Sequence, residues 1–228
     1  MSTLKIGMLL FPEVTIQDFV GPYEVFTRVE KFKVLVVSEI SEMIQAEGGL
    51  SLKADYSFEN CPQVDILFVP GGKGITPLLT NYTYLDFLNK QGQKASYITS
   101  VCTGSVLLGA AGLLKGYNAT THWRSLGLLE MMGIETIDKR IVVDRNRITG
   151  GGITAGIDFG LTLTALLAGE DTAKIIQLMM EYSPEPPFNS GSPNTAEPHI
   201  LQKATEITQP MFEARVKQLQ NHNYSRKS

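Results

Sequence analysis

The sequence predicts a doubly wound α/β sandwich, in which helices cover both faces of a mostly parallel sheet. Short apolar runs alternate with longer stretches that have helical spacing, and this alternation is typical of successive β–α–β units. The apolar runs are nearly continuous, as expected for strands that are covered on both faces. The 228 residues, 43% of them hydrophobic, suffice for one such domain with a well-buried core.

Each expected element follows from its local pattern. Four apolar runs should be strands of the parallel sheet, namely residues 4–11, 32–37, 65–69 and 97–101. Helical stretches lie between or after them, at about residues 16–29, 83–94, 103–114 and 124–132. A hairpin is expected over residues 140–149, followed by helices over residues 153–167 and 172–182.

Proline interrupts this pattern at residues 183–193, which should form a linker or a surface loop. Residues from about 198 to 220 have scattered helical periodicity and should dock as a terminal helix. We therefore expect one domain over residues 1–196 and a C-terminal helical tail over residues 197–228.

Composition excludes several classes of partner and site. The net charge of −3 and the scattered basic residues argue against a nucleic-acid surface. No apolar run approaches the ~20 residues of a membrane span, and no signal peptide is recognisable, so a cytoplasmic protein is expected. The two cysteines, Cys61 and Cys102, lie in no metal-type cluster, so we expect neither a disulfide framework nor a metal site.

Cys102 is the strongest candidate for chemistry. It follows the expected strand over residues 97–101 and precedes small residues that open a helix. Such a strand-turn-helix elbow lifts a nucleophile into the crevice at the carboxyl end of the strand. The helix N-terminus is expected to lower the pKa of the thiol. The alternative is a buried cysteine that packs as a small hydrophobe.

Two loops should meet Cys102 at this edge of the sheet. Asp18 is either a proton donor, whose pKa a neighbouring thiolate would raise, or a helix cap. Gly71 and Gly72 form either a plain turn or, with the amide of Thr103, an oxyanion hole.

Two further segments leave alternatives open. The triple glycine at residues 150–152 permits either close approach of a ligand to the backbone or a hinge. His122 is either a general base or a buried structural histidine beside Trp123. Cys61 has no apparent partner and is read as structural.

Together these segments resemble the ThiJ/PfpI superfamily and, within it, the isocyanide (isonitrile) hydratases. The matching segments are residues 10–14, 18–22, 70–72, 99–105, 119–123, 149–158 and 181–193. The resemblance implies a flavodoxin-like three-layer sandwich, related to class I glutamine amidotransferases, with Cys102 on the nucleophile elbow. Two departures matter, because protease-like members carry His at the position of Thr103 and glyoxalase-like members carry Glu in the loop of Asp18.

The resemblance further implies that an isocyanide is hydrated to an N-substituted formamide without a cofactor or a metal, by a homodimer. The Cys102 thiolate would attack the terminal carbon while Asp18 delivers a proton, and water activated by Asp18 would release the product from the thioimidate. The implied catalytic residues are Cys102, Asp18 and Thr103. The implied substrate and oxyanion contacts are Gly72, Gly151 and Ile153.

Other functions stay open on the same fold. A ligand sensor would bind a small molecule without turnover, and a redox or stress protein would use an oxidisable cysteine. A glyoxalase-type activity is a third alternative. A DNA-binding regulator is disfavoured, because fewer than about forty residues follow Pro193, too few for tandem helix-turn-helix modules.

Overall fold

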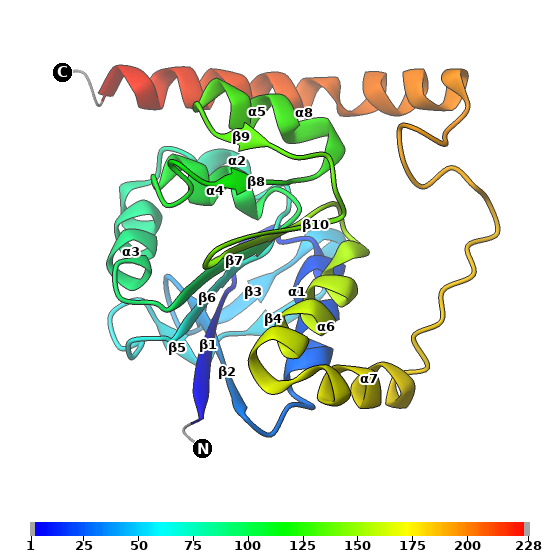
Figure 1. The fold of residues 1–228 in the computed structure, drawn as a ribbon. Coiled ribbons are helices and arrows are strands. Elements are labelled where there is room, and N and C mark those ends of the chain that lie inside the picture. Colours follow the sequence, from blue (N-terminus) through cyan, green and yellow to red (C-terminus); the bar gives the residue numbers. More distant parts are fainter. Residues whose placement is uncertain (1–2, 226–228) are drawn as a thin grey trace.

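The computed structural model describes residues 3–225, with side chains described as far as Asn221 in the last helix. A seven-stranded sheet forms its middle layer, in the order β10-β11-β7-β6-β1-β2-β5 (Figure 1). All neighbours in this sheet pair in parallel except β10 and β11, which form the expected hairpin. The strands are β1 (Leu4–Leu9), β2 (Phe32–Ser38), β5 (Tyr56–Ser57), β6 (Ile66–Val69), β7 (Tyr97–Val101), β10 (Ile141–Asp144) and β11 (Arg147–Gly150).

Helices cover both faces of this sheet, so the predicted α/β class with a mostly parallel sheet is confirmed. One face carries α1 (Ile16–Phe26), α6 (Ala155–Ala168) and α7 (Glu170–Met179). The other face carries α2 (Ile75–Leu78), α3 (Tyr82–Gly92) and α4 (Gly104–Ala110). The core between these layers is apolar, and its largest fully buried side chains include Phe11, Phe26, Phe68 and Phe159.

Glycines let α1 lie close against α6. A Cβ added at Gly160 would lie 3.0 Å from the Cβ of Val25, and one added at Gly156 would lie 3.0 Å from Cδ of Pro22. Both distances are tighter than ordinary van der Waals contact, so larger residues here would push the helices apart. This packing fixes the position of α1, which carries Asp18 in its first turn.

The carboxyl ends of the central strands lie in one row. Val69 pairs with Ser100, and Val101 pairs with Gly150. The loops that follow β6, β7 and β11 therefore leave the sheet side by side, as expected at the ligand-binding edge of an α/β sheet.

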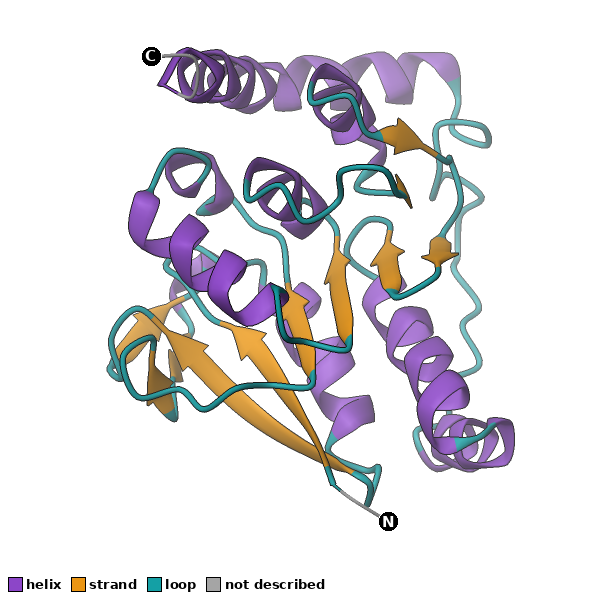
Figure 2. Cartoon of the chain, turned by 60° about the vertical axis from the view of Figure 1, so that its left-hand side comes forward, coloured by secondary structure: helices purple, strands orange, loops and turns teal. Residues whose placement is uncertain are grey.

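A smaller group of elements lies beyond this edge. It contains β8 (Asn118–Ala119), β9 (Glu135–Thr136), the 3-10 helix η2 (Trp123–Ser125) and α5 (Leu126–Met131). The last helix, α8 (Pro198–Ser225), contacts both α2 and η2, and Figures 1 and 2 both place it across this end of the molecule. The segment that leads to it is exposed throughout residues 183–191. None of the described helices is long and apolar enough to cross a membrane.

The observed elements differ from the expected ones mainly at their ends. The helix expected over residues 103–114 ends at Ala110, because Gly112 takes a left-handed φ of 78°. The strand expected over residues 4–11 ends at Leu9, just before a turn in which Glu13 has a φ of 58°. Sequence periodicity missed the shortest elements, which are β3 (Met43–Gln45), β4 (Ser51–Lys53), β5, β8, β9, α2 and η1 (Glu47–Gly49). The division into residues 1–196 and a tail stays a prediction, although α8 lies where that tail was expected.

Candidate active site

Cys102 occupies the predicted elbow between β7 and α4. Its φ of 51° is unusual for a residue with a side chain and is found here at a sharp turn. The surrounding backbone holds this conformation, because the Cys102 N–H donates to the carbonyls of Gly150 (3.0 Å) and Gly151 (2.9 Å). Its own carbonyl accepts a hydrogen bond from Thr121 Oγ1 at 2.7 Å. The elbow is therefore braced from two neighbouring segments.

Asp18 is fully buried beside this elbow. Its Oδ2 accepts the N–H of Gly71 at 3.1 Å, while its buried Oδ1 has no nitrogen or oxygen donor among the described residues. The N-cap position of α1 belongs to Thr15, so the alternative that Asp18 caps this helix is wrong. The carboxyl instead joins α1 to the loop after β6.

Burial raises the pKa of Asp18 to about 7. A hydrogen bond with the Cys102 thiol and the Gly71 amide both lower this pKa, and the charge of Glu47 raises it. Near neutral pH, therefore, the acid and the carboxylate are both populated. A group with this pKa can donate and accept protons at the pH of a cell.

The pKa of the Cys102 thiol is raised well above its ordinary value, first by burial and second by the charge of Asp18. The Thr103 amide and the Arg215 charge lower it, but by less. The expectation of a lowered thiol pKa is therefore wrong for the structure with an ionised Asp18, since burial outweighs the helix N-terminus. Protonation of Asp18 removes the negative charge that opposes the thiolate, so the thiolate forms more easily beside a neutral Asp18, although burial still opposes it.

Thr103 connects the elbow to the glycine turn. Its Oγ1 accepts the N–H of Gly72 at 3.1 Å, and the described hydrogen bonds do not join it to Asp18. The amides of Gly71 and Gly72 are thus already engaged by protein oxygens. The amide of Thr103 is the donor that faces the thiol. An oxyanion hole built on a free Gly72 amide is therefore not present in this arrangement.

The other predicted contacts lie on the opposite side of Cys102. The Gly151 N–H donates to Arg140 O at 2.8 Å, so Gly151 supports the elbow through its carbonyl and offers no free amide. Ile153 lines the same cavity as Cys102 with its side chain 39% exposed. A role of Gly72, Gly151 and Ile153 in substrate binding stays a prediction.

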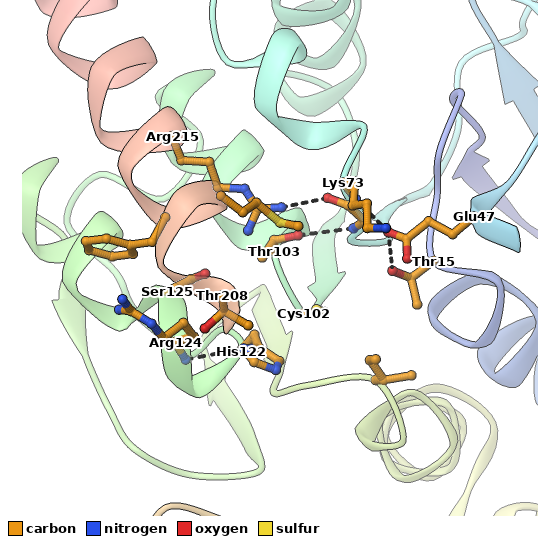
Figure 3. A pocket seen from close by; sticks show the side chains of 14 residues that line it. Thr15, Glu47, Lys73, Cys102, Thr103, His122, Arg124, Ser125, Thr208 and Arg215 are labelled. Atoms are coloured by element: carbon orange, nitrogen blue, oxygen red, sulfur yellow. Dashed lines mark hydrogen bonds between the residues drawn. The ribbon is translucent and has the colours of Figure 1, made fainter. Parts of the chain in front are cut away.

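A cavity of about 180 Å³ opens over Cys102 and Thr103 (Figure 3). The sandwich supplies one wall, which includes Thr15, Glu47, Gly72, Lys73 and Ile153. The residues around η2 supply a second wall with His122, Arg124 and Ser125. Helix α8 supplies the third with Thr208, Met211, Phe212 and Arg215. Asp18 does not line this cavity, because it is fully buried, and it reaches the site through its hydrogen bond with the Cys102 thiol.

His122 has a structural role at the cavity. Its Nδ1 accepts the backbone N–H of Arg124 at 3.2 Å, which caps η2. Burial lowers the pKa of His122, and the charges of Arg215 and Arg124 lower it further, so the ring is neutral at neutral pH. Cys61 lies elsewhere, where burial raises the pKa of its thiol to about 11.

The residues of α8 are the part of the site that the sequence analysis missed. The residues Thr208, Met211, Phe212, Arg215 and Leu219 stand at positions i, i+3, i+4, i+7 and i+11, which is the spacing of one helix face. An arginine between two apolar positions on that face was the sequence signal that could have indicated a role of this helix in the site.

Comparison with known proteins agrees with this geometry. Residues 4–166 match the DJ-1/PfpI family. The isonitrile hydratase of Pseudomonas putida is 47% identical over 212 residues, which cover 93% of both chains. A crystal structure of a ThiJ/PfpI family protein from Pseudomonas syringae, 40% identical, superposes with a TM-score of 0.93 and covers 96% of this chain and 91% of that one.

A transcriptional regulator is also similar. The HTH-type regulator GbdR of Pseudomonas aeruginosa is 30% identical over 186 residues, which cover 78% of this chain and 50% of the regulator. The region similar to this chain makes up nearly all of the Pseudomonas putida hydratase but only half of the regulator, where it is joined to further sequence. The family match extends over more than half of the sequence and includes the β7–α4 elbow with Cys102: this chain belongs to the DJ-1/PfpI family.

Proposed function

We propose that this protein is an isocyanide hydratase that converts R–N≡C and water to the formamide R–NH–CHO. One observation carries the proposal: a buried carboxyl with a pKa of about 7 lies against the thiol of a cysteine held on a strained elbow. Hydration of an isocyanide needs a nucleophile and a proton at the same carbon, and this pair can supply both. The 47% identity to the isonitrile hydratase of Pseudomonas putida supports the same reaction.

The first half of the proposed cycle forms a thioimidate. The Cys102 thiolate bonds to the terminal carbon, and protonated Asp18 transfers its proton to that carbon. The product is R–N=CH–S–Cys102 with an ionised Asp18. The Thr103 amide, which faces the sulfur, stabilises the thiolate before attack.

The second half hydrolyses this intermediate. Asp18 takes a proton from water as the oxygen bonds to carbon, and it passes that proton to the nitrogen. The tetrahedral adduct then collapses to the formamide, the C–S bond breaks, and the hydroxyl proton returns to Asp18. Thiolate and carboxylic acid are regenerated, so the cycle balances without a redox step or a cofactor.

The experiment is incubation of the pure protein with cyclohexyl isocyanide and detection of N-cyclohexylformamide by proton NMR. We expect turnover by the wild type and none by Cys102→Ser, because the hydroxyl is a far weaker nucleophile at this pH. Absence of formamide from folded wild-type protein would refute the proposed activity.

A ligand sensor is the second candidate, and the similarity to GbdR favours it over the remaining alternatives. A sensor would bind a small molecule in the cavity equally well with Cys102→Ser and would release it unchanged. Calorimetric titration of both variants separates binding from turnover. A redox or stress function predicts instead that oxidation of Cys102, rather than substrate consumption, changes the behaviour of the protein.

We also propose a homodimer. Large apolar side chains are exposed on and after α7, where Leu178 is 82%, Met179 66% and Phe188 78% exposed. Large apolar side chains that are exposed in one chain are often covered at an interface between chains. Analytical ultracentrifugation at micromolar concentration checks this, and a stable monomer would contradict it.

A further inference from the structure

Arg215 is a buried cation on the face of the last helix that packs against the rest of the domain. Its side chain is 5% exposed, whereas Glu213, Ala214 and Lys217 nearby on α8 are exposed. A buried guanidinium carries a large desolvation penalty unless it makes specific contacts. Figure 3 shows it reaching from α8 into the cavity toward Thr103.

Its hydrogen bonds connect α8 to the glycine turn. Nη2 donates to the carbonyl of Gly72 at 2.8 Å, and Nε donates to Thr76 Oγ1 at 3.2 Å. The N–H of Gly72 in turn donates to Thr103 Oγ1. One guanidinium therefore holds Gly72, whose own N–H contacts Thr103. Thr103 is the residue whose amide faces the Cys102 thiol.

The charge of Arg215 also acts on the thiol directly. The titratable or charged groups around the thiol are Asp18, Glu47, Lys73, His122, Arg124 and Arg215. Of the cations, Arg215 is the one that lowers the pKa of Cys102, and the Cys102 charge raises the pKa of Arg215. Arg124 is occupied elsewhere, since its guanidinium hydrogen-bonds Gln209 and lies 4.3 Å from the centre of the Phe212 ring.

We infer that Arg215 is a positioning residue for the hydration site: α8 brings its guanidinium beside the elbow, where its charge favours the Cys102 thiolate and its hydrogen bonds hold the glycine turn against Thr103. The consequence for turnover rests on the proposed function. The effect on the thiol does not rest on the proposed function, because it concerns only whether Cys102 is a thiol or a thiolate.

The test compares Arg215→Gln with Arg215→Lys. Glutamine keeps a donor for the Gly72 carbonyl but loses the positive charge. Lysine keeps the positive charge but loses the planar guanidinium that donates to two acceptors at once. The readout is the rate at which iodoacetamide alkylates Cys102, followed by peptide mass spectrometry from pH 6 to 11, a range that extends above the ordinary pKa of a thiol because burial raises that of Cys102. This readout needs no isocyanide, so it gives a result even if the protein is not a hydratase.

We expect Arg215→Gln to move the pH midpoint of alkylation upward by about one pH unit, and so to slow alkylation about tenfold at pH 7. Arg215→Lys should stay near the wild-type midpoint. Formamide production should fall in kcat with Arg215→Gln and be partly restored with Arg215→Lys.

Leu219→Ala is the matched control. Leu219 is 1% exposed on the same helix and carries no charge, so its truncation weakens the packing of α8 while the Arg215 charge is kept. Its alkylation midpoint should equal that of the wild type. A wild-type midpoint in folded Arg215→Gln would overturn the inference, as would an upward shift of equal size in Leu219→Ala. If both Arg215 variants fail to fold, Arg215 is an anchor of α8 and the inference is likewise overturned.

Discussion

Gly71 donates its N–H to Asp18 Oδ2 at 3.1 Å, and this contact holds the carboxyl on which the proposed chemistry depends. Asp18 lies in the first turn of α1 and Gly71 in the loop after β6, so the contact also ties the start of α1 to the end of β6. It leaves no room for a side chain at residue 71. A Cβ there would lie 2.7 Å from Asp18 Oδ2 and from both N and Oγ1 of Thr103.

Gly71→Ala should therefore disable the site. The added methyl group must displace either the carboxyl or the elbow backbone, and we expect formamide production to fall by at least about 10²-fold with a stability loss of about 1–3 kcal/mol. Steady-state kinetics and thermal unfolding measure both effects. Gly127→Ala is the control, because its Cβ would meet no heavy atom within 4 Å and should stabilise α5 slightly. Equal activity of the two variants would contradict this account.

Asp18→Asn should abolish most of the turnover while the fold persists. The amide oxygen can still accept the Gly71 N–H, but the side chain no longer exchanges protons, and general acid-base catalysis typically contributes ~10²–10⁴-fold. Asp18→Glu should lose less, since only the geometry is changed. Formamide production by each variant, with circular dichroism as a folding control, decides the point. Turnover of Asp18→Asn near the wild-type rate would remove Asp18 from the mechanism.

Stability should depend on pH through the same carboxyl. Its pKa is 3.8 in an unfolded chain and about 7 in the folded protein, so the folded state binds more protons between these values. Stability is therefore lost as the pH rises from about 4 to 7, and the penalty persists above 7. Asp18→Asn should be more stable than the wild type at pH 8, with little difference at pH 4. Urea unfolding at both pH values checks this, and a constant difference between the two proteins would contradict it.

Thr103→Val should destabilise the glycine turn. Valine has a similar shape but leaves the buried Gly72 N–H without its acceptor, which costs about 1–3 kcal/mol. Thr103→Ser keeps the hydroxyl and should stay within about 1 kcal/mol of the wild type. Chemical denaturation compares the pair. If valine is no more destabilising than serine, the hydrogen bond from the Gly72 N–H to the Thr103 hydroxyl does not stabilise the turn, and this account is contradicted.

The fold and the two central residues of the site, Cys102 and Asp18, were predictable because they depend on local sequence patterns. Continuous apolar runs identified the buried strands, and the small residues after Val101 identified the elbow at Cys102. The direction of the thiol's pKa was not predictable, because burial and the Asp18 charge depend on contacts between distant segments. The contact between the Gly72 amide and Thr103 Oγ1 was not predictable for the same kind of reason, and a role of Gly72 in substrate binding stays a prediction.

Helix α8 was expected as a tail, yet it walls the cavity opposite the nucleophile. The match to the family ends at residue 166, so the reacting pair lies inside the matched region and this wall lies outside it, although the isonitrile hydratase of Pseudomonas putida is similar over 93% of the chain. Selectivity can therefore change by replacement of one terminal segment while Cys102 and Asp18 stay as they are. Exchange of this helix between relatives offers a route to new substrate ranges that leaves the bond-making groups undisturbed.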